Sequence, residues 1–245
     1  MTPPLVLLHG FTGSPAGFDG LLQALPGVTA HRPALLGHGP PDAATASVQS
    51  FDNEVARLLE LFPREPVHLA GYSLGARLAL GIALSAPGRV ARLTLVSGQP
   101  GLATEPEREA RRHADARWCA LLESRGIEAF ADAWAAQPLF ATQGHLPAAT
   151  REHRRQERLR HDPRGLARSL RVTGLGEMPD YGPRLAALTL PVTLLVGELD
   201  AKFLTLGRTM AAALPQARLT IAPSAGHDLL LERPDLVALE LSRAF

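Results

Sequence analysis

The sequence Gly71-Tyr72-Ser73-Leu74-Gly75 decides the fold, because it joins a predicted strand to a predicted helix. An apolar run at 67–70 precedes it, and a helix-forming run at 76–84 follows it. A strand, the pattern Gly-x-Ser-x-Gly and a helix in succession predict a sharp turn that presents a serine nucleophile at the carboxyl end of a strand. The turn strains the backbone of Ser73, and the flanking glycines leave room for it. The alternative interpretation is a glycine-rich turn that contains a serine by chance.

The other apolar segments predict a parallel α/β sheet. Strands are expected at 4–8, 28–35, 67–70, 90–97, 191–197 and 217–222, and helices at 18–25, 48–62, 76–84, 203–214 and 234–245. Strands that alternate with helices in this order imply a parallel sheet covered on both faces. Residues 99–184 lack a strand-like run and are rich in Arg, Glu and Ala, so they predict a helical insertion. We therefore expect one α/β catalytic core, formed by 1–98 and 185–245, that carries a helical lid at 99–184.

The composition excludes several classes of function. Apolar residues make up 46% of the 245 residues, which is enough for a core, and no run approaches the ~18 apolar residues of a membrane helix. The net charge of +1 gives no support for a nucleic-acid partner. The N-terminus lacks the pattern of an export signal, and the single cysteine, Cys119, fits a reducing compartment, so we expect a cytoplasmic protein. Cys119 itself is interpreted as a small packing residue.

Two further polar residues follow predicted strands. Asp200 comes shortly after the strand at 191–197, and His227 shortly after the strand at 217–222. The order Ser73, Asp200, His227 predicts a catalytic triad, because a serine hydroxyl needs an imidazole to accept its proton and the imidazole needs a carboxylate to orient it. Glu198 and Asp228 are competing acids, but Asp200 has the better position relative to its strand.

Two glycine-punctuated loops complete a recognisable set of motifs. They are His9-Gly10-Phe11-Thr12-Gly13-Ser14 and Leu36-Gly37-His38-Gly39. With the serine motif and the triad, they resemble the α/β-hydrolase superfamily over essentially the whole chain. The resemblance implies an oxyanion hole made by the N–H groups of Phe11 and Leu74. It also implies structural roles for His9 and His38.

A narrower resemblance is carried by segments around these motifs and in the lid. They are 8–14, 71–77, 99–102, 198–203, Arg111 with Trp118, and the stretch Trp134-Ala135-Ala136-Gln137-Pro138-Leu139-Phe140. These segments are similar to the family of 2-succinyl-6-hydroxy-2,4-cyclohexadiene-1-carboxylate synthases of menaquinone biosynthesis. The resemblance implies that six residues contact the substrate: Tyr72, Arg77, Arg111, Trp134, Arg160 and Lys202.

Two of these cations are unusual by position alone. Arg77 lies four residues after Ser73, on the same face of a helix that otherwise consists of small and apolar residues. A buried guanidinium requires an anionic partner, which could be a substrate or a carboxylate of the protein. Lys202 is the only lysine and lies two residues after Asp200. Its alternative interpretation is an ordinary surface lysine.

The resemblance implies an elimination that needs neither a metal nor another cofactor. Ser73, helped by His227, would remove a proton α to a ketone of a small anionic carboxylate substrate, and pyruvate would be expelled. A first alternative is a carboxylesterase or another serine hydrolase of small acidic esters or thioesters. A second is a non-catalytic ligand-binding member of the fold. The sequence is compatible with a monomer or a homodimer.

Overall fold

The computed structural model describes residues 3–40 and 43–243 and contains one six-stranded parallel sheet. The strands lie in the order β2-β1-β3-β4-β5-β6. Their bounds are β1 Leu5–Leu8, β2 Ala30–His31, β3 Val67–Tyr72, β4 Val90–Val96, β5 Val192–Gly197 and β6 Ala217–Ala222. Because β1 lies between β2 and β3, the order reverses beside β1 and the carboxyl ends of all strands share one edge.

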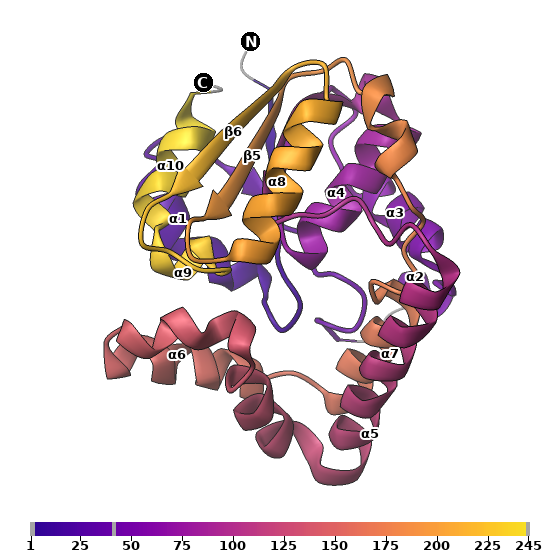
Figure 1. Ribbon diagram of the computed structural model, residues 1–245, viewed down its shortest axis with the longest axis vertical. Helices are drawn as coiled ribbons and strands as arrows, with labels where there is room; N and C mark the ends of the chain where they lie inside the picture. Colours follow the sequence, from indigo (N-terminus) through magenta and orange to yellow (C-terminus); the bar gives the residue numbers. More distant parts are fainter. Residues whose placement is uncertain (1–2, 41–42, 244–245) are drawn as a thin grey trace.

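Helices cover both faces of the sheet and its carboxyl edge. The α-helices are α1 Asp19–Gln23, α2 Ala43–Ala46, α3 Phe51–Glu60, α4 Leu74–Ser85, α5 Glu105–Ala135, α6 Ala148–Leu159, α7 Pro163–Thr173, α8 Ala201–Ala213, α9 Leu229–Glu232 and α10 Pro234–Ser242. Short 3-10 helices are η1 Pro15–Phe18, η2 Pro87–Arg89, η3 Pro138–His145 and η4 Gly182–Ala187. In Figure 1 the helices α5, α6 and α7 lie at the opposite end of the molecule from both termini, where β5 and β6 point.

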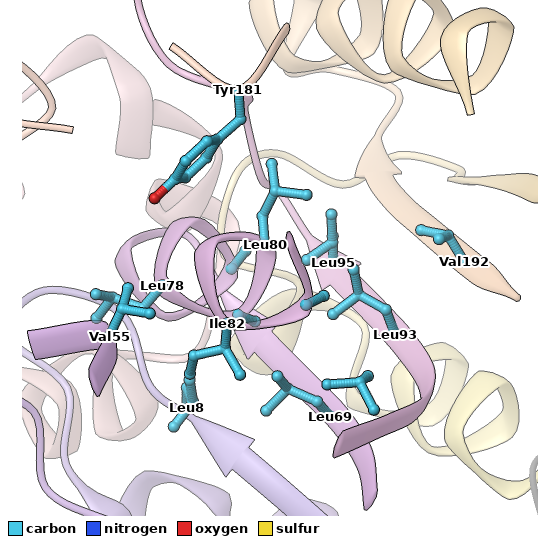
Figure 2. Packing of buried hydrophobic residues seen from close by; sticks show 14 of the residues in the cluster. Leu8, Val55, Leu69, Leu78, Leu80, Ile82, Leu93, Leu95, Tyr181 and Val192 are labelled. Carbon is cyan, nitrogen blue, oxygen red and sulfur yellow. The ribbon is translucent and has the colours of Figure 1, made fainter. Parts of the chain in front are cut away.

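Alternating side chains of the strands form two cores. Leu5 and Leu7 of β1 belong to the core that contains residues of α1 and α10, whereas Val6 and Leu8 belong to the core around α3, α4 and α8. Helix α4 is buried along nearly all its length, because it lies between the sheet and its neighbouring helices. Figure 2 shows side chains of α4 among those of β1, β3 and β4: Leu78, Leu80 and Ile82 with Leu8, Leu69, Leu93 and Leu95. This packing fixes the serine turn that joins β3 to α4.

The region 99–184 is helical, as the sequence predicts. Helix α5 is capped by Thr104 and Glu107, which exchange side-chain and backbone hydrogen bonds, and its direction changes at Gly126, where φ is 76°. Helix α7 is capped by Asp162, whose carboxylate accepts hydrogen bonds from N–H groups of the first turn, and it packs against α5. Among the helices that the structure describes, none combines the length and apolarity needed to cross a membrane.

Several predicted bounds were too wide. The strand predicted at 28–35 pairs only at Ala30–His31, because the backbone N–H groups of Leu35 and Leu36 bond to side chains of the His9 loop and of α3 instead of to β1. The helix predicted at 48–62 begins at Phe51, because Ser50 caps it by accepting from Asn53 N. The closing helix ends at Ser242, and the predicted end at 245 lies outside the described residues.

Candidate active site

The turn at Ser73 has the strained geometry that the sequence predicts. Its backbone has φ 51° and ψ −104°, and its N–H donates to Val96 O at 2.9 Å, which ties the turn to β4. A Cβ at Gly75 would lie 2.1 Å from Leu8 O, and one at Gly71 would lie 2.3 Å from Gly75 O. Only glycine fits on both sides of the serine, because the backbones of β1, β3 and α4 meet there. This confirms the predicted sharp turn from strand to helix.

Ser73, His227 and Asp200 are brought together across the carboxyl edge of the sheet. His227 Nε2 lies 3.1 Å from Ser73 Oγ, and His227 Nδ1 lies 2.7 Å from Asp200 Oδ2. The other oxygen of Asp200 accepts from Phe203 N at 3.3 Å, so the first turn of α8 holds the carboxylate in place. The imidazole and the carboxylate are both buried. This geometry allows His227 to accept the serine proton while Asp200 orients the ring.

The two competing acids lie elsewhere. Glu198 accepts a hydrogen bond from Ser224 N at 2.9 Å, and Asp228 forms an ion pair with Arg154 at 3.3 Å. The sequence does not single out Ser97, whose hydroxyl donates to His227 O at 2.7 Å and so fixes the backbone that carries the imidazole. Its position at the end of β4, beside the serine turn, is the signal that could have identified it.

Phe11 and Leu74 both line the cavity that contains Ser73. Neither backbone N–H donates to a protein acceptor in the part of the chain that the structure describes. Leu74 is the first residue of α4, where a helix presents unpaired N–H groups and a partial positive charge. Two N–H groups in such positions can stabilise an oxyanion that forms next to the serine.

His9 and His38 support the loop that carries Phe11. The Nδ1–H group of His9 donates to Gly10 O at 2.9 Å, and that of His38 donates to Leu36 O at 2.9 Å. Burial lowers the pKa of His9 to about 3 and lowers the pKa of His38 well below its ordinary value. Both imidazoles are therefore neutral at pH 7, and both bond to the backbone, in agreement with the structural roles expected for them.

The Ser73 cavity is lined by cations as well as by aromatic and aliphatic side chains. Tyr72 and Trp134 form part of its wall, and both are buried. Five cationic residues also line it: Arg77, Arg111, Arg154, Arg158 and Lys202. The structure thus brings five of the six residues expected to contact a substrate, Arg160 being the exception, into one cavity with the serine. In the described part of the chain, no group of His, Cys, Asp or Glu forms a metal site.

Arg77 is buried and has no carboxylate partner among the described residues. Its Nη1 donates to Thr173 O at 3.0 Å, and no ion pair to it is present in that part of the chain. Burial, and then the positive charge of Arg111, lower the pKa of Arg77 to about 9, although Asp115 opposes this. A guanidinium in this state is stabilised by any anion that enters the cavity.

Arg111 and Lys202 face the same space from the lid and from the core. Arg111 Nε donates to Asp115 Oδ1 at 2.9 Å, which leaves the other nitrogens of its guanidinium available. Lys202 is exposed, but it lines the cavity, where partial desolvation and next the charge of Arg111 lower its pKa. Lys202 therefore belongs to the charge cluster of the cavity and is not an isolated surface lysine.

The structure does not place Arg160 in the Ser73 cavity. Arg160 is the C-cap of α6 and lines a different cavity, beside η1, α1 and α9. Arg158, two residues earlier, is buried and lines the Ser73 cavity, with its guanidinium 5.5 Å from the Phe140 ring centre. Two residues on a helix are about 200° apart, so only one of them can point into the cavity. Burial, and then Arg154, lower the pKa of Arg158 to about 10.

The wider charge pattern distinguishes Arg158 from Arg154. Arg154 forms ion pairs with Glu157 and Asp228. Arg158 forms none with the described carboxylates, and its Nε is buried without a hydrogen-bond partner. Arg158 therefore resembles Arg77 as a buried cation that forms no ion pair with a described carboxylate.

Comparison with known proteins places the chain among α/β hydrolases. The model of the alpha/beta hydrolase family matches residues 5–241. A Bacillus subtilis protein named provisionally as a 2-succinyl-6-hydroxy-2,4-cyclohexadiene-1-carboxylate synthase is 38% identical over 236 residues, which are 95% of this chain and 86% of that protein. The synthase of the same name from Enterobacter sp. (strain 638) is 33% identical over 245 residues, 98% of this chain and 91% of its own.

A solved structure agrees with these relatives. The structure of MenH from S. aureus superposes with a TM-score of 0.93 at 30% sequence identity, and the match covers 99% of this chain and 92% of that one. The similarity includes the helical region as well as the sheet, because nearly the whole of both chains is covered.

Proposed function

This chain belongs to the alpha/beta hydrolase family, and from that premise we propose that it is an enzyme of menaquinone biosynthesis that eliminates pyruvate from 2-succinyl-5-enolpyruvyl-6-hydroxy-3-cyclohexene-1-carboxylate. The product would be 2-succinyl-6-hydroxy-2,4-cyclohexadiene-1-carboxylate, the compound in the names of its relatives. One observation carries the proposal. The serine shares its cavity with two buried guanidinium groups, Arg77 and Arg158, that pair with no described carboxylate.

The charge of the substrate matches that cavity. It carries a ring carboxylate, a succinyl carboxylate and an enolpyruvyl carboxylate. Arg77, Arg158 and Arg111 can each bind a carboxylate by paired hydrogen bonds, and Lys202 adds a fourth positive charge. A hydrolase of neutral esters would have no use for this number of cations, and their desolvation would only reduce its stability.

The reaction begins with proton transfer. His227 accepts the proton of Ser73 Oγ, and the serine oxygen removes the ring proton next to the succinyl ketone. The electron pair of the broken C–H bond moves into the ketone, and the enolate oxygen lies against the N–H groups of Phe11 and Leu74. Asp200 stabilises the imidazolium that forms.

The second step breaks the bond to pyruvate. The enolate electrons return, shift through the ring double bond and break the bond between the ring carbon and the enolpyruvyl oxygen. Pyruvate leaves as its enolate and takes up a proton, for which the imidazolium of His227 is the donor on this route. Neither an acyl-enzyme nor a metal ion takes part.

The test is the release of pyruvate from the substrate, generated in situ by the preceding enzyme of the route. Wild type and Ser73→Ala are compared, with Ser85→Ala as a control, because Ser85 lies at the far end of α4. We expect fast release by the wild type and by S85A, and loss of release in S73A. Release no faster than the background would overturn the proposal. A panel of small acidic esters and thioesters would then identify a hydrolase, and failure of a fluorophosphonate to label Ser73 would indicate a ligand-binding protein.

A further inference from the structure

Three imidazoles hold three successive peptide units of the loop that carries Phe11. His9 Nδ1–H donates to Gly10 O at 2.9 Å, and Thr12 N donates to His38 Nε2 at 3.1 Å. His161 Nε2–H donates to Thr12 O at 3.2 Å. The rings form a row, with centres 5.0 Å apart for His9 and His38 and 5.3 Å apart for His38 and His161.

These hydrogen bonds determine where the Phe11 N–H points. In a planar trans peptide the C=O and the N–H point in opposite directions. The Gly10 carbonyl is held by His9 and by Gly13 N at 2.9 Å, so the N–H of the same peptide, that of Phe11, is turned the opposite way. Thr12 has φ 63°, in the left-handed region that a β-branched residue rarely adopts. External contacts must therefore maintain this loop.

Two of the three histidines belong to the core, and the third comes from the lid. His9 follows β1 and His38 follows the short strand β2, whereas His161 lies between α6 and α7. His161 is buried, and it is separated from Thr12 by 149 residues in sequence. Burial lowers its pKa, so at pH 7 it is a neutral ring, and the acceptor Thr12 O requires the proton to be on Nε2.

We propose that His161 is a positioning residue through which the lid fixes the oxyanion hole: its hydrogen bond to Thr12 O holds the peptide units on either side of Thr12, and thereby the Phe11 N–H, in the orientation that donates to the enolate oxygen. The inference rests on the proposed function, because that reaction forms the oxyanion at Phe11. The lid supplies the third hydrogen bond of the loop through His161. His161 does not line the Ser73 cavity, so it acts through the loop and not on the substrate.

If His161 served only for packing, its substitutions would affect activity differently. A ring that only fills space is replaced by another ring of similar size at little cost to activity, whereas a hydrogen-bond donor is replaced by another donor in the same place. Gln carries an N–H donor at a distance from its Cα similar to that of His Nε2, and Phe keeps the ring without a donor. H161Q and H161F therefore separate the two roles.

The experiment measures kcat and KM for pyruvate release, and the rate at which a fluorophosphonate labels Ser73, in wild type, H161F and H161Q. We expect H161F to lose at least about tenfold in kcat and in labelling rate, with KM within about twofold, because a misplaced oxyanion donor weakens the transition state and not substrate binding. H161Q should stay within about threefold of the wild type. His145→Phe is the control, since His145 is exposed and outside the cavity.

Two results would overturn the proposal: an active H161F, or an H161Q that loses as much activity as H161F. If H161F does not fold, H161N replaces it, because the shorter Asn amide does not reach Thr12 O, and equal activity of H161Q and H161N would then be the contradicting result. The labelling rate depends on Ser73 and the oxyanion hole but not on the substrate. If the wild type is labelled and releases no pyruvate, the proposed function fails, while the labelling rates still decide the role of His161.

Discussion

Arg111 and Asp115 lie one turn apart on α5, and the Arg111 Nε donates to Asp115 Oδ1 at 2.9 Å. Asp115 is 5% exposed, and a Cβ at Gly174 would lie 2.8 Å from its Oδ2, so glycine leaves room for the carboxylate there. Burial raises the pKa of Asp115, and Arg111 lowers it in opposition. The carboxylate thus directs one arginine of the cavity and partly balances a second, Arg77.

Replacing Asp115 by Asn should therefore weaken substrate binding. The side chain keeps its shape but no longer carries the charge that orients Arg111, so we expect KM for the tricarboxylate to rise about tenfold, equivalent to about 1.4 kcal/mol. Steady-state kinetics of pyruvate release measure this. Asp132→Asn is the matched control on the same helix, because the exposed pair of Asp132 with Arg155 contributes little. Equal KM values for the two variants would contradict the role of Asp115.

Arg158 and Arg160 provide a second test, because sequence and structure disagree about them. Arg158 lies in the Ser73 cavity and Arg160 in another. A hydrogen bond between charged groups contributes about 1.5–3 kcal/mol, so Arg158→Gln should reduce kcat/KM roughly ten- to a hundredfold. Arg160→Gln should stay within about twofold. If R160Q loses activity and R158Q does not, the substrate contact is made by Arg160 and not by Arg158.

The proximity of the three proposed triad residues could be predicted, because each comes shortly after a strand. In a parallel sheet the carboxyl ends of the strands lie together, so the order of Ser73, Asp200 and His227 in the chain already implied their proximity in space. The glycines of the serine turn could be predicted from the motif, although the backbone that requires Gly75 is that of Leu8 in β1, distant in sequence.

The choice between Arg158 and Arg160 could not be predicted in this way, because α6 meets the cavity through tertiary packing. The rotation of α6 about its axis determines which of its arginines faces Ser73. A shift of two residues along the sequence moves the side chain to the opposite face of the helix. The role of His161 could not be predicted from the sequence, because its hydrogen-bond partner Thr12 is 149 residues away. The short strand β2 was overestimated for a related reason: Leu35 N and Leu36 N bond to His9 and Glu54, and apolar sequence does not reveal such partners.

The buried neutral histidines predict a fall in stability at mildly acidic pH. The pKa of His9 is about 3 in the folded chain against 6.5 when unfolded, so between these values the unfolded chain binds a proton that the folded chain does not. The free energy of unfolding therefore falls as the pH drops below 6.5, and for His9 the loss from pH 7 to 5.5 is about 1 kcal/mol.

Urea denaturation at pH 7 and pH 5.5 measures this loss. The free energy of unfolding should fall less between pH 7 and pH 5.5 in His9→Gln than in the wild type, by about that 1 kcal/mol. This comparison holds even if the substitution lowers the stability equally at both pH values. His145→Gln, at an exposed position, is the control and should match the wild type. If H9Q loses as much free energy of unfolding between the two pH values as the wild type, His9 does not account for the acid sensitivity.

We expect that Arg77 does not contribute to the stability of the fold. Its guanidinium is buried, its described partner is only the Thr173 carbonyl, and burial lowers its pKa to about 9. Arg77→Met removes this charge and keeps most of the volume, so we expect an unchanged or higher melting temperature. The same variant should lose at least about tenfold in kcat/KM, more than about 1.4 kcal/mol of transition-state stabilisation.

The matched control for Arg77 is Arg89→Met. Arg89 also donates to a backbone carbonyl, Pro63 O at 2.7 Å, but lies outside the cavity. Its loss should reduce the melting temperature and leave kcat/KM unchanged, the reverse of the result for R77M. If R77M instead melts at a lower temperature and keeps its activity, Arg77 is a structural residue. The cavity would then hold one fewer cation for the three carboxylates, and Arg158 alone would remain as a buried guanidinium without an anion among the described residues.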